Sequence, residues 1–106
     1  MDVCIFWKET TVEIGRYLVL GTMHVSMKTA ELLDAWALLE PSGRPLGVAS
    51  THYGWFIRTS DVEGPDREQI PGELLVAMRV GRELACDYLL FDCDALAIEG
   101  LEVFPW

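Results

Sequence analysis

Two uninterrupted apolar runs, at residues 17–20 and 88–91, predict buried strands, and the first strand is expected to extend through Gly21 and Thr22 to Val25. The second run reads Tyr-Leu-Leu-Phe and lies between Asp87 and Asp92. A short apolar run with polar ends is typical of a strand that is covered on both faces. The rest of the chain can be arranged as layers packed against this strand.

A β-hairpin is predicted for residues 46–59, where Val, Thr and aromatic residues are frequent. Gly54 divides this stretch. The expected layout is one strand over 46–51, a tight turn, and a second strand over 55–59. One continuous strand with a bulge at Gly54 is the alternative.

Two further stretches have apolar residues at helical spacing. The spacing predicts a helix over 27–39, with Ser26 as its N-cap. A second helix is predicted over 71–85, with Pro71 as its first residue. Gly81 in the middle of this helix costs about 1 kcal/mol relative to Ala, so we expect it to allow close packing on the sheet.

The elements follow one another as β-α-β-β-α-β. This order predicts an α+β fold of the ferredoxin-like type, a two-layer sandwich with an antiparallel sheet and both helices on one face. A chain of 106 residues fits a single domain, residues 1–106. Within it we expect an N-terminal arm or edge strand (1–15), a core (16–94) and an aromatic C-terminal tail (95–106), which folds back over the sheet or fills a groove.

The charge of the chain is strongly negative. Seventeen acidic residues against eight basic ones give a net charge of −9, and residues 61–106 contain eleven of the acids and three of the bases. Such a surface repels phosphate groups, so direct binding of nucleic acid or of an anionic membrane is not expected. The expected partner is a protein with a basic surface, although a negative surface kept for solubility accounts for the same composition.

Cysteine usage and hydropathy indicate a cytoplasmic protein. Cys4, Cys86 and Cys93 are an odd number without paired spacing, which argues against a disulfide framework. No basic segment precedes an apolar block at the N-terminus, and no apolar run approaches the roughly 20 residues that span a bilayer.

One pair of acidic residues suggests metal chemistry. Asp92 and Asp94 are two residues apart just beyond a predicted strand, and with His24 they form a candidate site for a divalent cation. The surrounding run is similar to the first motif of haloacid-dehalogenase-type phosphatases, but the last lysine of the chain is Lys28. The like charges on both sides of Cys93 disfavour its thiolate. No complete catalytic set is present, and no cofactor is expected.

The acidic loop after the hairpin, together with two aromatic residues of the hairpin, is the candidate surface for a protein partner. For the aromatic residues, the inner face of the sheet is the alternative position. The candidate protein-interaction residues are Asp61, Glu63, Asp66, Glu68, Tyr53 and Trp55.

Three stretches carry a family resemblance. They are Thr22-x-His24-x-Ser26 before a helix, Tyr53-Gly54-Trp55-Phe56, and the run from Tyr88 to Asp94 with a terminal Phe-Pro-Trp. Together they resemble a family of small uncharacterised bacterial proteins known only as a domain of unknown function, over about residues 16–106. The resemblance implies a gene of plasmids, integrative elements or prophages, and it assigns no activity.

Three hypotheses for function follow. The first is a non-enzymatic acidic interaction protein, an inhibitor of a host defence nuclease or of a CRISPR or restriction complex by nucleic-acid mimicry. The second is a divalent-metal-dependent enzyme that uses Asp92 and Asp94. The third is a homodimer that is joined through an edge strand or through the aromatic tail.

Overall fold

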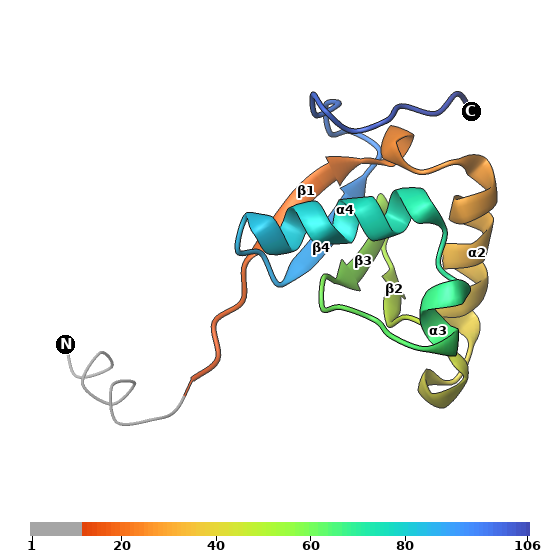
Figure 1. The fold of residues 1–106 in the computed structure, drawn as a ribbon. Helices are drawn as coiled ribbons and strands as arrows, with labels where there is room; N and C mark the ends of the chain where they lie inside the picture. Colours follow the sequence, from red (N-terminus) through yellow and green to blue (C-terminus); the bar gives the residue numbers. More distant parts are fainter. Residues whose placement is uncertain (1–11) are drawn as a thin grey trace.

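The computed structural model describes residues 12–106, and Figure 1 shows their arrangement. A four-stranded sheet forms one layer, and helices form the other. Short 3₁₀ turns, η1 (Thr22–His24) and η2 (Pro41–Gly43), precede and follow the first long helix. The first strand, predicted to extend to Val25, ends at Gly21 because η1 follows it directly. The main elements are β1 (Tyr17–Gly21), α2 (Met27–Leu38), β2 (Val48–Ser50), β3 (Gly54–Arg58), α3 (Pro65–Glu68), α4 (Gly72–Glu83) and β4 (Tyr88–Asp92).

The predicted α+β class is confirmed, but the prediction of a fully antiparallel sheet is wrong. The strand order is β1-β4-β3-β2, and β1 pairs with β4 in parallel while the other pairs are antiparallel. The sheet is therefore mixed, and the ferredoxin-like arrangement is not confirmed.

The connection between β3 and β4 explains the mixed sheet. After β3, the chain passes through α3 along the sheet before α4 runs back (Figure 1). Because the chain crosses the sheet twice, β4 starts beside the end of β3, where Tyr88 pairs with Arg58. A single helical crossing, as in a ferredoxin-like domain, would have made these two strands parallel.

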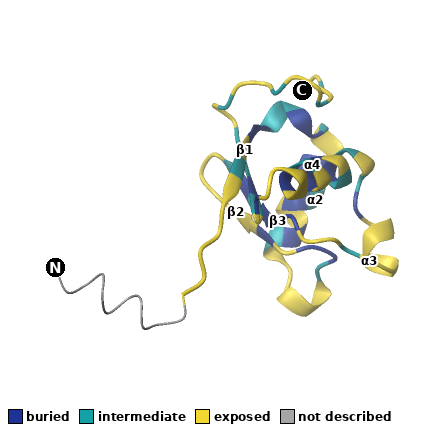
Figure 2. Cartoon of the chain, turned by 60° about the vertical axis from the view of Figure 1, so that its left-hand side comes forward, coloured by how far each residue is buried: buried dark blue, intermediate teal, exposed yellow. Residues whose placement is uncertain are grey.

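Both long helices cover the same face of the sheet, as predicted. Figure 2 shows that buried residues gather between the strands and the helices. Alternate strand residues point into this layer because side chains of a strand alternate between its faces. The core combines Leu20, Trp55, Ile57, Leu89 and Phe91 of the strands with Leu33, Trp36, Leu74 and Met78 of the helices.

The opposite face of the sheet, called the outer face below, has no helix over it among residues 12–106. The prediction that the 88–91 run is covered on both faces is therefore wrong, because only Leu89 and Phe91 of that run are buried in the core. The outward-facing residues of the run, Tyr88 and Leu90, are also aromatic or aliphatic, so the sequence pattern resembled that of a fully buried strand. By strand register, the outer face contains Tyr17, Val19, Ala49, Phe56, Tyr88 and Leu90, with Arg58 near one end and Asp92 near the other.

Local signals place the helix starts well and the helix ends less well. Ser26 caps α2, since its hydroxyl accepts a hydrogen bond from the Thr29 amide at 3.2 Å. Pro71 immediately precedes α4, one residue from its predicted role. The second helix ends at Glu83 and not at 85, because Ala85 adopts a left-handed conformation with φ of 59°.

The hairpin prediction is confirmed. Val48 pairs with Ile57 and Ser50 pairs with Trp55 across two separate strands, so one continuous bulged strand is excluded. Thr51 closes the turn: its amide donates to the Gly54 carbonyl at 2.7 Å, and its hydroxyl accepts from the Gly54 amide at 3.0 Å.

The C-terminal tail folds back across η1 and the start of α2. The amide of Phe104 donates to the Met23 carbonyl at 2.8 Å, and the indole of Trp106 donates to the Val25 carbonyl at 3.0 Å. Most of the N-terminal arm predicted for residues 1–15, including Cys4, lies outside the described residues. No helix among residues 12–106 is long and apolar enough to cross a bilayer.

Candidate functional site

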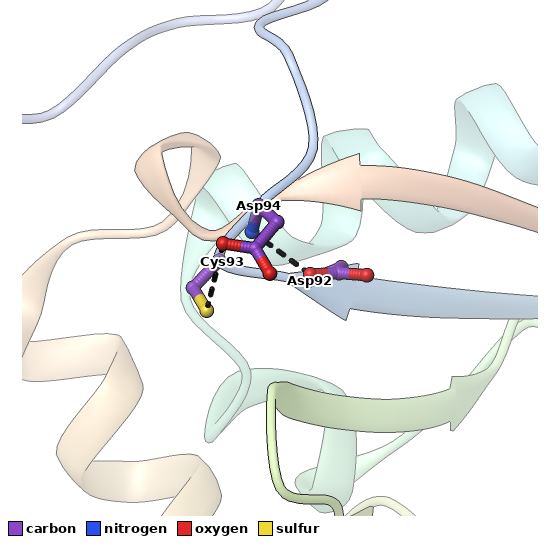
Figure 3. A group of neighbouring side chains, drawn as sticks. All are labelled: Asp92, Cys93 and Asp94. Carbon is purple, nitrogen blue, oxygen red and sulfur yellow. Dashed lines mark hydrogen bonds between the residues drawn. The ribbon is translucent and has the colours of Figure 1, made fainter.

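Asp92, Cys93 and Asp94, which include the predicted metal ligands, form a tight turn at the end of β4. The Asp94 amide donates to the Asp92 carboxylate at 2.8 Å (Figure 3). The Ala95 amide donates to the Asp92 carbonyl at 3.1 Å. An aspartate that accepts from the backbone two residues further on stabilises a turn. Asp92 therefore has a structural role at the end of its strand.

The turn also brings three potential metal ligands together. One ligand atom each from Asp92, Cys93 and Asp94 lies within 4.8 Å of the others. Cys93 and Asp94 are exposed and Asp92 is half-buried. Two carboxylates fit a hard cation such as Mg²⁺, which would keep several waters here because it needs about six oxygen ligands.

His24, the third predicted metal ligand, does not join this group. Its side chain is 2% exposed. Nε2 accepts a hydrogen bond from the Ile98 amide at 2.9 Å, so Nδ1 carries the proton and donates to the Glu102 carbonyl at 2.8 Å. Both ring nitrogens thus hold the tail, and His24 is a structural residue.

A cavity of about 270 Å³ opens beside the turn, where β4 ends and β3 begins. We call it the aromatic pocket. Because β3 and β4 are antiparallel, the loop before β3 and the turn after β4 meet at this end of the sheet, and the tail reaches the same place. Its chemically informative lining residues are Asp34, His52, Tyr53, Trp55, Cys93 and Trp106.

Trp55 forms a buried wall of the aromatic pocket. It is 7% exposed, and its indole N–H donates to Asp34 Oδ1 at 2.8 Å. The structure therefore places Trp55 on the inner face of the sheet, which is the alternative that the sequence left open.

Tyr53 and Trp106 are the accessible aromatic residues of the pocket, at 54% and 58% exposure. His52 packs against Tyr53 edge-to-face, with ring centroids 5.0 Å apart. The bond between Trp106 and Val25 fixes the indole at the edge of the cavity. Trp106 is a pocket residue that sequence reasoning missed, since only the return of the tail brings it there.

The four predicted acidic interaction residues lie away from the aromatic pocket. None of them lines it, and Asp61 follows β3 whereas Tyr53 precedes this strand. Asp61 is paired with Arg67 at 3.2 Å and with Arg82 at 4.0 Å. Glu63, Asp66 and Glu68 are exposed, and none of them has an ion pair among residues 12–106.

The comparison with known families gives one result. A model described as the C-terminal domain of a family of unknown function, DUF5983, matches residues 17–106. The chain belongs to this family. No curated protein and no solved structure matches it.

The DUF5983 match begins at the first residue of β1 and includes the tail. It therefore contains the Asp92–Asp94 turn, the aromatic pocket and the acidic segment at 61–68. The resemblance read from about residues 16–106 is confirmed at the level of a family of unknown function, which assigns no activity to these features.

Glu73 is a half-buried acidic residue in the first turn of α4 of the DUF5983 chain. Its carboxylate accepts from the Thr29 hydroxyl at 2.6 Å and from the Ser26 amide at 3.1 Å, which joins the starts of α4 and α2. Partial burial raises the pKa of this carboxyl, but the hydrogen bonds from Thr29 and Ser26 outweigh burial and hold the pKa below its ordinary value.

Proposed function

We propose that this DUF5983 chain is a non-enzymatic acidic protein that binds a basic segment of a protein partner, with the aromatic pocket as the anchor. The observation that carries the proposal is the combination of exposed aromatic rings and a carboxylate around one cavity. Tyr53 and Trp106 line the pocket with Asp34. An arginine or lysine side chain fits this chemistry, because its cation is attracted both to aromatic faces and to a carboxylate.

The charges around the pocket support a basic ligand. Asp34 is exposed, and among residues 12–106 its carboxylate receives one hydrogen bond, from Trp55. Asp92 and Asp94 flank Cys93, which lines the pocket. Of these carboxylates only that of Asp34 lines the pocket, and a cationic side chain that enters the pocket approaches it directly.

The wider distribution of charge points in the same direction. All three arginines of residues 61–106 lie within 4.0 Å of a carboxylate of the same chain: Arg67 and Arg82 near Asp61, and Arg79 near Glu83. The other acidic side chains of this half have no basic neighbour of that kind among the described residues. The excess of unpaired carboxylates produces a negative electrostatic field, which attracts a basic protein and accelerates its association.

A nucleic-acid-binding enzyme of a host defence system, such as a nuclease or a CRISPR or restriction complex, is the partner class that we propose. The groove that holds the phosphate backbone in such an enzyme is lined with Arg and Lys. An acidic protein that occupies this groove would exclude the nucleic acid, so the chain would act as an inhibitor by mimicry.

Binding of a fluorescent nine-residue arginine peptide tests the anchor directly. We expect fluorescence anisotropy to show binding that weakens as salt rises. Removal of one aromatic ring or of the Asp34 charge should weaken binding about 2- to 30-fold, the range that one cation–π contact supplies. The variants are Tyr53→Ala, Trp106→Ala and Asp34→Asn, and Glu40→Gln is the control, an exposed acid outside the pocket. Equal binding by all four proteins would refute the anchor.

A divalent-metal-dependent enzyme is the second candidate function, favoured by the 4.8 Å clustering of ligand atoms from Asp92, Cys93 and Asp94. Isothermal titration of Mg²⁺, Mn²⁺ and Zn²⁺ into the wild type and into Asp92→Asn decides it. Heat of binding in the wild type that is lost in the variant would support a metal site. If the wild type shows no heat of binding with any of the three metals, a divalent-metal-dependent enzyme is ruled out.

A further inference from the structure

The outer face of the sheet has a regular arrangement of side chains in three rows across the strands. The strand register places Val19, Leu90, Phe56 and Ala49 side by side in the middle row. A second row, near the start of β4, consists of Tyr17, Tyr88 and Arg58. The third row, at the end of β4, contains Gly21, Asp92 and Gly54.

The aromatic side chains of the outer face form a packed and partly exposed cluster. Phe56 stacks on Tyr88 with centroids 4.9 Å apart, and Tyr17 meets Phe56 edge-to-face at 6.2 Å. Tyr17 is nevertheless 56% exposed and Val19 is 40% exposed. A contiguous exposed apolar patch of this kind marks an interaction surface.

The two ends of the outer face differ in shape and in charge. At one end, the Arg58 guanidinium lies 5.2 Å from the centroid of the Tyr88 ring. At the other end, Asp92 carries a negative charge, and Gly54 presents only backbone. Gly54 must be glycine because an added Cβ would clash with the Phe91 carbonyl oxygen.

We propose that the outer face binds the same face of a second copy of this chain, related by a two-fold axis that runs across the strands. This axis superposes the middle row on its own copy and exchanges the two end rows. Tyr88 of each copy then lies opposite Asp92 of the other, and Arg58 lies opposite Gly54, one strand away from that Asp92. A two-fold interface makes every such contact twice.

Three features of the face favour a second copy over other ligands. The positive end meets the negative end, and the bulky Arg58 meets a glycine. Tyr17 falls over Gly21 of the other copy, where the Met23 sulfur occupies the place that a Cβ of residue 21 would take, and sulfur–aromatic contacts are favourable. Face-to-face packing of two sheets about 10 Å apart is an ordinary way to bury such residues.

The expected dimer is weak. Three rows across four strands cover on the order of 300–400 Å² per copy, below the roughly 800 Å² per partner of a standard interface. The net charge of −9 on each copy also opposes association at a distance. Added salt screens this repulsion and should strengthen the dimer, whereas salt weakens binding of a basic partner.

Sedimentation equilibrium of the full chain in reducing buffer tests the proposal. Dimer should accumulate between about 10 µM and 1 mM protein, the range of a weak interface, and more of it should form at high salt. Arg58→Asp and Asp92→Arg should each reduce the dimer, and the double variant should restore it. The reciprocal exchange Arg79→Asp with Glu83→Arg, on exposed positions of α4, is the control and should leave the dimer unchanged.

Three outcomes would contradict the proposed dimer. A monomer at all concentrations and salts overturns the proposal, as does a dimer that responds equally to the control exchange. Circular dichroism of each variant separates lost association from lost folding. If the full chain is monomeric but a variant lacking residues 1–11 dimerises, that segment occupies the outer face and the proposal is wrong. Dimer loss in both single variants with recovery in the double variant establishes the interface.

Discussion

His24 joins the C-terminal tail to the rest of the fold through both ring nitrogens. The Ile98 amide donates to Nε2, and Nδ1 donates to the Glu102 carbonyl. Replacement of His24 removes the partners of the Ile98 amide and the Glu102 carbonyl in a part-buried setting, and a polar group left unpaired there costs more than the hydrogen bond contributes.

We therefore expect His24→Ala to destabilise the fold by about 2–4 kcal/mol, the combined cost of two lost hydrogen bonds and a cavity. Chemical denaturation followed by tryptophan fluorescence measures the change. His52→Ala removes the other histidine, which is exposed, and should be nearly neutral. Equal stability of the two variants would contradict a structural role for His24.

Glu73 should make stability depend on pH at the acid side. Its folded pKa lies below the ordinary value of 4.5, so the carboxylate form favours the folded state. This contribution is present above about pH 4.5 and is lost as pH falls through the lower folded pKa. Chemical denaturation of the wild type and of Glu73→Gln at several pH values between about 3 and 7, where carboxyl groups titrate, measures the difference in their free energy of unfolding. A constant difference between the two proteins across this range would show that Glu73 has no such role.

At the level of single residues, the sequence predicted local roles and missed distant partners. Ser26 was identified as an N-cap because the relevant amides follow it directly. The partners of His24 are more than 70 residues away, so no local pattern could reveal them. The hydrogen bond between Trp55 and Asp34, which are 21 residues apart, could not be found from a local pattern either.

The helix α4 depends on a close approach to the sheet at Gly81. An added Cβ would lie 2.7 Å from Thr59 Cγ2 and 2.9 Å from Leu89 Cδ2. The expectation that this glycine allows close packing is thus confirmed.

Gly81→Ala should destabilise the protein by about 1–3 kcal/mol through overpacking, although Ala favours a helix by about 1 kcal/mol. Gly72→Ala is the matched control, because an added Cβ there meets no atom within 4 Å. Thermal unfolding of both variants measures the difference. Stabilisation by Gly81→Ala would show that the helix can move away from the sheet at little cost.

At the level of elements, periodicity identified the helices and strands, but strand pairing could not be derived. The pattern of residues 60–70 predicted a loop and gave no sign that α3 would add a second crossing of the sheet. That crossing alone reverses β4 relative to β3 and makes it parallel to β1. Apolar character on both faces of β4 likewise concealed which face the helices cover.

At the scale of the whole molecule, the predicted interaction residues belong to two regions: Tyr53 and Trp55 line the aromatic pocket, and none of the four acidic residues of the 61–68 segment lines it. Asp61 already pairs with Arg67 and Arg82, so its loss should affect the fold more than the binding of a partner. Glu63, Asp66 and Glu68 carry negative charge without ion pairs among residues 12–106, and they are the better test of long-range attraction.

Simultaneous reversal of Glu63, Asp66 and Glu68 to lysine should slow association with the arginine peptide and flatten its dependence on salt. The dissociation rate should change little, because none of these residues lines the aromatic pocket. Stopped-flow fluorescence at several salt concentrations separates the two rates. Reversal of Glu31 and Glu40 to lysine changes the net charge at positions outside residues 61–68. This variant measures how far net charge alone alters the association rate. An association rate unchanged by the triple reversal would argue against a role for the 61–68 segment.

The central claim is that a cationic side chain binds in the aromatic pocket. Titration of ¹⁵N-labelled full-length protein with the arginine peptide, followed in ¹H–¹⁵N spectra, tests this claim most directly. The account predicts shifts of the Trp55 and Trp106 indole signals and of amides in residues 50–55 and 93–95. Shifts confined to other parts of the chain, or no shifts at peptide concentrations that saturate a weak site, would contradict it.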